Sequence, residues 1–130
     1  MLEIKPIQSK SIQKALCEKC SISYIEDAFA YSAYDGDCFL GMSQFTIESG
    51  YASIKNLVSA DGIHDFEAMF ILGRAVLNFI DLCSVSTAKI EKNASEERLA
   101  RAIGFKRGED GEYLPLSLIG MFDAKCPSHK

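Results

Sequence analysis

The feature that most constrains this chain is a long apolar segment, residues 65–83, which lies between two strand-like segments. Its apolar side chains recur at helical spacing, and they are Phe66, Met69, Phe70, Leu77 and Ile80. This periodicity predicts a helix with one buried face. The flanking segments 51–59 and 85–91 read as strands. Because a strand, a helix and a second strand form a crossover unit, we expect the two strands to pair in parallel.

Further strands are predicted before this unit. Segment 2–7 alternates apolar and polar residues, and Pro6 places it near a sheet edge. Segments 28–34 and 38–49 flank an Asp-Gly-Asp turn, which is typical of an antiparallel hairpin. The alternation of 51–59 slips near Asn56, which indicates a β-bulge.

Two shorter helices are predicted on either side of the central unit. Segment 11–20 has helical spacing and Ser11 as its cap. Segment 93–105 carries a start signal at Asn93 and a stop signal at Gly104. A turn and at least one more strand follow in 106–122.

The order of these elements predicts the fold class. We expect one domain over residues 1–130 of the α+β (mixed α/β) class, with a central, mostly antiparallel sheet, one parallel crossover and helices on both faces. Residues 28–34 should pair antiparallel with 38–48, and residues 52–58 should pair in parallel with 85–90.

Charge and hydropathy exclude several classes of function. The chain has 14 Lys and Arg against 18 Asp and Glu, a net charge of −4, without a basic cluster, so we expect no nucleic-acid partner. No apolar run reaches the ~18 residues of a membrane span, and the first ten residues lack the apolar centre of a signal peptide. We therefore expect a cytoplasmic protein that binds no membrane, with its five cysteines reduced.

Two short motifs resemble one known family. "NASEERLARAIGF" shares Asn93, Leu99, Gly104 and Phe105 with a motif common in the GNAT acyltransferases, although Ala100 stands where that family often has Tyr. "GRAVLNFI" is similar to the run that opens the coenzyme-facing helix in that family. The predicted order of elements resembles the GNAT fold over nearly the whole chain.

The resemblance implies an activity and a set of contacts. It implies an acetyl-CoA-dependent N-acetyltransferase that acts on a small-molecule or peptide amine, and it allows a homodimer. The residues that it implies for acetyl-CoA binding are Leu57, Val58, Gly73, Arg74, Ala75 and Asn93. In that family a carboxylate often acts as base and a tyrosine as acid, which here implies Glu48 and Tyr113, with Tyr51 as an alternative acid.

The position of Gly73 separates two interpretations. If Gly73 opens the helix, its backbone can cradle the pyrophosphate of acetyl-CoA. If the helix begins near Asp65, Gly73 lies two turns inside and serves close packing. The helix start then holds Asp61, Asp65 and Glu67, and His64 is the one residue that can offset them, as a partial cation, so we expect weak or undetectable acetyl-CoA binding. A second hypothesis is therefore a degenerate GNAT-fold binding or interaction module without coenzyme.

The cysteines offer one further pattern. Cys17, Cys20, Cys126 and His129 form a Cys3His set with the two-residue spacers of structural zinc sites. The alternative is a set of reduced thiols near a terminal segment. We expect no bound metal.

Overall fold

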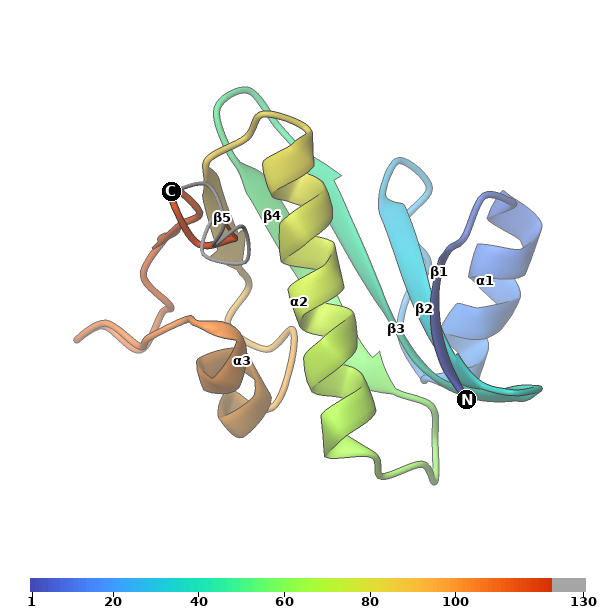
Figure 1. Ribbon diagram of the computed structural model, residues 1–130. Helices are drawn as coiled ribbons and strands as arrows, with labels where there is room; N and C mark the ends of the chain where they lie inside the picture. Colours follow the sequence, from blue (N-terminus) through green and yellow to red (C-terminus); the bar gives the residue numbers. More distant parts are fainter. Residues whose placement is uncertain (123–130) are drawn as a thin grey trace, which may run out of the picture.

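The computed structural model describes residues 1–122 and shows one mixed sheet with helices on both faces (Figure 1). Its strands, in spatial as well as sequence order, are β1 (Leu2–Pro6), β2 (Phe29–Asp35), β3 (Cys38–Ile47), β4 (Ala52–Ser59), β5 (Thr87–Ile90) and β6 (Leu116–Ser117). Its helices are α1 (Lys10–Lys19), α2 (Phe66–Leu82) and α3 (Glu97–Ile103). No helix in this part of the chain is long and apolar enough to cross a bilayer.

The strand pairing confirms the predicted fold class. Neighbouring strands pair antiparallel, except that β4 and β5 pair in parallel, with Ala52 opposite Ala88 and Ile54 opposite Ile90. α2 makes the crossover between these two strands, as the apolar periodicity predicted. The β2–β3 hairpin also forms, and β1 is an edge strand.

The bulge predicted near Asn56 is present in β4. Gln44 of β3 lies opposite Asn56, whereas the next residue, Phe45, lies opposite Ile54. Lys55 is therefore the extra residue of the bulge. The Asn56 side chain takes part in the irregular pairing, because its Oδ1 atom accepts a hydrogen bond from the Gln44 backbone N–H at 2.9 Å.

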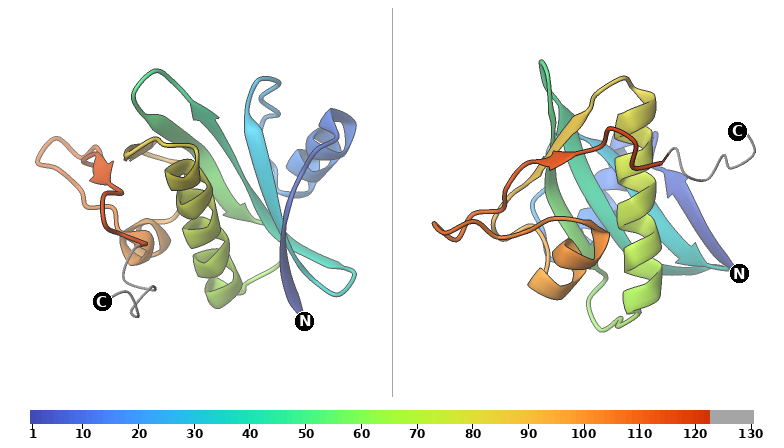
Figure 2. Two further views of the ribbon diagram at one scale, coloured as in Figure 1. Left: turned by 45° about the horizontal axis from the view of Figure 1, so that its top comes forward. Right: turned by 60° about the vertical axis from the view of Figure 1, so that its left-hand side comes forward.

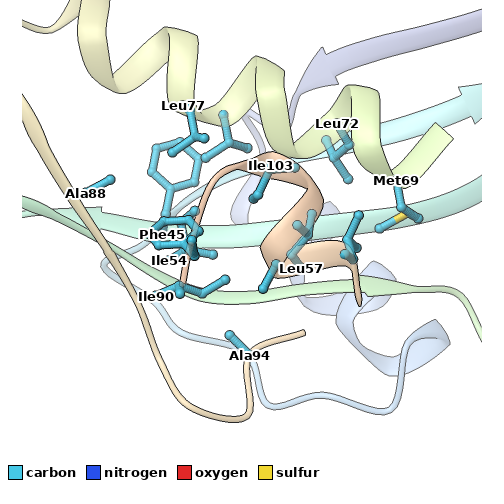
Figure 3. Close-up of a cluster of buried hydrophobic side chains, with 14 of the residues drawn as sticks. Phe45, Ile54, Leu57, Met69, Leu72, Leu77, Ala88, Ile90, Ala94 and Ile103 are labelled. Atoms are coloured by element: carbon cyan, nitrogen blue, oxygen red, sulfur yellow. The ribbon is translucent and has the colours of Figure 1, made fainter. Parts of the chain in front are cut away.

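Two apolar clusters fix the helices on opposite faces of the sheet. The larger one joins α2 and α3 to one face, where Leu57, Leu72 and Ile103 are almost fully buried (Figure 3). The smaller one joins Leu16 and Cys17 of α1 to Met42 on the other face. Figure 2 shows this layered arrangement from two further directions, with α2 lying across the sheet. A strand presents alternate residues to its two faces, so β3 contributes to both clusters.

A buried amide network holds the loop between α1 and β2 against the sheet. Gln44 Oε1 accepts from Gln13 Nε2 at 2.8 Å and from the Ile25 N–H at 3.0 Å. Gln44 Nε2 donates to the Ser23 carbonyl at 2.9 Å. Both glutamine side chains are fully buried, so these bonds offset the cost of removing two amides from water.

The structure corrects the predicted starts of two helices. α1 is capped by Ser9, whose hydroxyl accepts from the Ile12 N–H at 3.3 Å, and Ser11 lies inside the helix. α3 begins after Glu96, so Asn93 lies in the preceding turn and does not cap it. Asn93 was misassigned because a capping pattern specifies spacing, whereas the close packing of the 91–95 turn on β4 decides where the helix begins. The predicted stop at Gly104 is confirmed, with φ of 128°.

Candidate functional site

A cleft of about 640 Å³ lies where β4 ends and α2 begins. The end of β4, the loop 60–65, the first turn of α2 and the start of α3 line it. Leu57 and Val58, two of the residues implied for acetyl-CoA binding, are part of this lining. The cleft follows from the crossover topology, since β4 and β5 separate beyond their last paired residues, Ile54 and Ile90.

The edge of β4 that faces the cleft carries free backbone groups. Across this edge, the Leu57 N–H donates to the Ala94 carbonyl at 2.8 Å. In a strand the N–H and C=O of one residue point to the same side and alternate along the chain, so the Leu57 carbonyl and the Ser59 N–H also face this edge. No strand of residues 1–122 pairs with β4 beyond Ile54 on this side. An extended ligand can therefore hydrogen-bond here as an added strand does.

The acidic residues at the start of α2 are already engaged. Asp65 caps the helix, with its Oδ1 atom accepting from the Ala68 N–H at 3.0 Å. Asp61 is held toward α1, because its Oδ2 atom accepts from the Ser21 hydroxyl at 2.6 Å and its N–H donates to the Lys19 carbonyl at 2.8 Å. Glu67 lies in the first turn and is exposed. The predicted helix start is confirmed, and two of its three carboxylates serve the local structure.

Arg98 brings a cation to this cleft. Its guanidinium carbon lies 3.8 Å from the ring centroid of Phe66, the first residue of α2. Arg98 lines the cleft, and within residues 1–122 no carboxylate forms an ion pair with it. A cation held on an aromatic face at a helix start is suited to an anionic ligand. No pattern in the sequence indicates this contact, which arises when α3 packs beside α2.

The neighbouring arginines explain why Arg98 stays available. Glu97 accepts from Arg101 Nε at 2.8 Å and from Arg107 Nε at 3.3 Å. These hydrogen bonds, the one from Arg101 first, lower the pKa of Glu97 below its ordinary value. The carboxylate next to Arg98 in sequence is thus paired with two other guanidinium groups.

The other residues implied for coenzyme binding lie away from the cleft. Gly73 is buried in the middle of α2, where an added Cβ would come within 2.9 Å of Ile103 Cγ2 and 3.1 Å of Leu57 Cδ2. Its position fits close packing, the second of the two interpretations. Arg74 and Ala75 line a separate groove with Phe122, and Asn93 is exposed in the turn before α3.

Neither residue implied for catalysis lines the cleft. Glu48 is exposed in the turn between β3 and β4, at the opposite end of β4. Tyr113 packs edge-on against Phe105 and beneath the Arg107 guanidinium, which lies 4.1 Å from its ring centroid. Its hydroxyl is buried and has no hydrogen-bond partner among the described residues. The roles given to Glu48 and Tyr113 stay predictions.

The described residues hold no metal cluster. Within residues 1–122 no group of three or more His, Cys, Asp or Glu side chains is placed to hold an ion. Cys17 and Cys20 are buried free thiols, and burial raises the pKa of Cys20 to about 12. Cys126 and His129, the other members of the Cys3His pattern, lie outside the described residues.

Comparisons with known proteins establish the fold. No family model and no curated protein matches the chain in sequence. The IAA acetyltransferase from Bacillus cereus ATCC 14579 is similar in structure, with a TM-score of 0.69 and 18% identity over 84% of this chain and 79% of that chain. The ribosomal-protein-S18-alanine N-acetyltransferase from Escherichia coli has a TM-score of 0.65 and 14% identity, over 90% and 95%.

A third solved structure is an acetyltransferase from Bacillus subtilis in complex with CoA. Its TM-score is 0.64 and its identity 17%, over 83% of this chain and 78% of that chain. At this level of identity the similarity defines architecture alone. The chain has the GNAT fold, as the predicted order of its helices and strands implied.

Proposed function

We propose that this chain is an acyl-CoA-dependent N-acyltransferase that binds acetyl-CoA in the cleft between β4 and α2. The diphosphate lies at the start of α2 beside Arg98. The extended pantetheine arm follows the open edge of β4 and bonds to the Ser59 N–H and the Leu57 carbonyl. Similar structures named as acetyltransferases, one of them determined in complex with CoA, support this proposal.

The observation that carries the proposal is the position of Arg98. The guanidinium stands over Phe66 without an ion-pair partner in residues 1–122, in the same cleft as the free backbone groups of β4. One ligand that is both extended and anionic satisfies these two features together. The cleft therefore fits an acyl-CoA better than it fits a neutral ligand or the apolar surface of a protein partner.

The chemistry asked of the site is modest. An acyl thioester is attacked directly by a neutral amine, the C–N bond forms and the C–S bond breaks. The proton that the nitrogen loses passes to the coenzyme thiolate, so the products are an amide and the CoA thiol. The chain contributes binding and orientation, which can supply a large share of a rate enhancement. The N–H of Leu57 is engaged by Ala94, so the free donor along this edge is that of Ser59.

Calorimetric titration with CoA and acetyl-CoA tests the proposal. We expect the wild-type protein to bind both, more weakly than in the low micromolar range, because acidic residues surround the start of α2. Arg98→Gln should weaken binding about 10- to 100-fold, the factor expected for a lost charge-assisted hydrogen bond of ~1.5–3 kcal/mol. Arg101→Gln is the matched control, since Arg101 lies on the same helix but pairs with Glu97. Absence of CoA binding to the folded wild-type protein would refute the proposal.

A second function is favoured by one observation. The Asp65 carboxylate already satisfies the Ala68 N–H, a donor that would otherwise be available to a phosphate. Together with Ala100 in the position where the family often has Tyr, this supports a GNAT-fold interaction module that binds no coenzyme. The same titration separates the two functions, since the module predicts no heat with CoA and no effect of Arg98→Gln.

A further inference from the structure

The face of β4 and β5 that lies away from α2 carries a polar row. On both strands the alternate residues Ala52, Ile54, Ala88 and Ile90 belong to the apolar cluster under α2. Ser53 and Lys89 therefore point to the opposite face. The strand register places Thr46, Ser53 and Lys89 directly beside one another across β3, β4 and β5.

The groups of this row have unused hydrogen-bonding capacity. Thr46 and Ser53 are each 8% exposed, and the Thr46 hydroxyl has no hydrogen-bond partner among the described residues. Lys89 is exposed, its Nζ lies 4.2 Å from the centroid of the Tyr51 ring, and it forms no ion pair with any residue of 1–122. Lys89, at the end of the row, is therefore a cation that is held over Tyr51 and has no ion-pair partner in residues 1–122.

A carboxylate lies next to Lys89 on the same face of the sheet. Glu91 follows the last residue of β5, and its Oε2 atom accepts from Lys55 Nζ at 3.0 Å. Lys89 and Glu91 are two residues apart on one side of the strand, a separation of about 7 Å along the backbone. The face therefore presents the positive Lys89 and the negative Glu91 at a separation that a short ligand with two polar ends can span.

We propose that this face binds the acceptor amine, and that the acceptor carries a carboxylate a few bonds from its amine. The acceptor platform consists of Thr46, Tyr51, Ser53, Lys55, Lys89 and Glu91. Glu91 accepts a hydrogen bond from the acceptor's neutral amino group through Oε1, the oxygen that is not bonded to Lys55, and Lys89 binds the acceptor's carboxylate. This inference rests on the proposed function and adds a class of substrate to it, namely free amino acids and acidic peptide N-termini.

The location of the acceptor platform supports this role. β4 and β5 stop pairing at Ile54 and Ile90, directly beside Ser53 and Lys89. The acyl-CoA cleft opens from this separation on the side of α2 and α3, and the acceptor platform lies on the other side. Two substrates that approach from opposite faces can meet where the strands part, without competing for one surface.

The test compares two acceptors that differ only in charge, β-alanine and β-alaninamide, by thiol release from acetyl-CoA. The wild-type protein should prefer β-alanine. Lys89→Gln should raise the KM for β-alanine about fivefold, the factor for one exposed ion pair at its upper strength, and should leave that for β-alaninamide unchanged. Lys14→Gln, on the exposed side of α1, removes the same charge and should change neither KM.

The outcomes separate this inference from the proposed function. If CoA binds and acetyl transfer occurs with equal KM for both acceptors, or with no effect of Lys89→Gln, the acceptor platform is refuted and the acyltransferase stands. If CoA does not bind, the acyltransferase is refuted. In that case, and also if CoA binds but neither acceptor is acetylated, β-alanine is titrated alone by NMR. Shifts of the Tyr51 and Ser53 amides that Lys89→Gln abolishes would support the acceptor platform, and their absence would refute it.

Discussion

Replacing Gly73 by alanine tests whether this glycine serves packing or ligand binding. In a helix interior alanine is more favourable than glycine by ~0.8–1.0 kcal/mol, so without neighbours the change would stabilise the protein. Here the added Cβ would lie 2.9 Å from Ile103 Cγ2 and 3.1 Å from both Ile103 Cδ1 and Leu57 Cδ2. Both neighbours are almost fully buried, so relief requires α2 and α3 to move apart.

The expected change in the free energy of unfolding is the difference between these two opposing effects. Inserting a methyl group into a packed core costs ~1–3 kcal/mol, and subtracting the helix gain leaves a net loss of ~0–2 kcal/mol. Gly73→Ala should therefore lower the midpoint of thermal unfolding by about 3–5 °C per kcal/mol lost. Because Gly73 lies outside the cleft lining, CoA affinity should be unchanged.

The same substitution made together with Ile103→Ala tests the packing argument more directly. Ile103→Ala alone should cost ~2–5 kcal/mol by leaving a cavity. In that background Gly73→Ala should become stabilising by about 1 kcal/mol, since two of the three nearest atoms are gone, Leu57 can shift into the space that Ile103 leaves, and the helix preference remains. Urea unfolding of the four proteins measures this sign change. Stabilisation of the wild type by Gly73→Ala, or loss of CoA binding with stability intact, would show that the packing argument is incorrect.

Three further predictions use the same proteins and methods. Asp65→Asn combined with Glu67→Gln should strengthen CoA binding and retain the helix cap, because asparagine caps a helix as well as aspartate does; weaker binding would contradict the repulsion argument. Gln44→Leu should destabilise the protein by ~2–4 kcal/mol in urea unfolding, since Gln13, the Ile25 N–H and the Ser23 carbonyl lose their partner. Burial first, then the charges of Cys17 and Asp61, raise the Cys20 pKa from about 9 to about 12, so folding favours the neutral thiol. The resulting stability is present below pH 9 and lost as the pH rises toward 12, and Cys20→Ala should flatten that decline in unfolding measured against pH.

Local patterns accounted for much of the fold. The apolar period of α2 and the β-like segments beside it were enough to predict the parallel pair, because a crossover helix permits one arrangement of its strands. The slip at Asn56 marked the bulge for a similar reason, since alternation is a property of the strand itself. The start of α3 was missed because its position depends on how the preceding turn packs against β4.

The candidate site was harder to predict because its parts come from distant elements. Phe66 and Arg98 are 32 positions apart in the sequence, and neither belongs to a motif that suggests their contact. Glu48 was chosen from its strand, but the direction of β4 places it at the end remote from the cleft. No motif singles out Lys89 or Glu91. Their positions follow from the strand register, which places Lys89 beside Ser53 and Glu91 beside Lys55.

The attachment of Asp61 has a consequence for the two layers of the protein. Its N–H and its carboxylate connect the cleft loop to Lys19 and Ser21, at the end of α1. α1 packs on the face of the sheet opposite α2, yet these bonds pass the end of β4 and join α1 to the cleft. A ligand that displaces the loop must therefore break the two bonds or carry the end of α1 with it. The sheet separates the two layers spatially but does not isolate them mechanically.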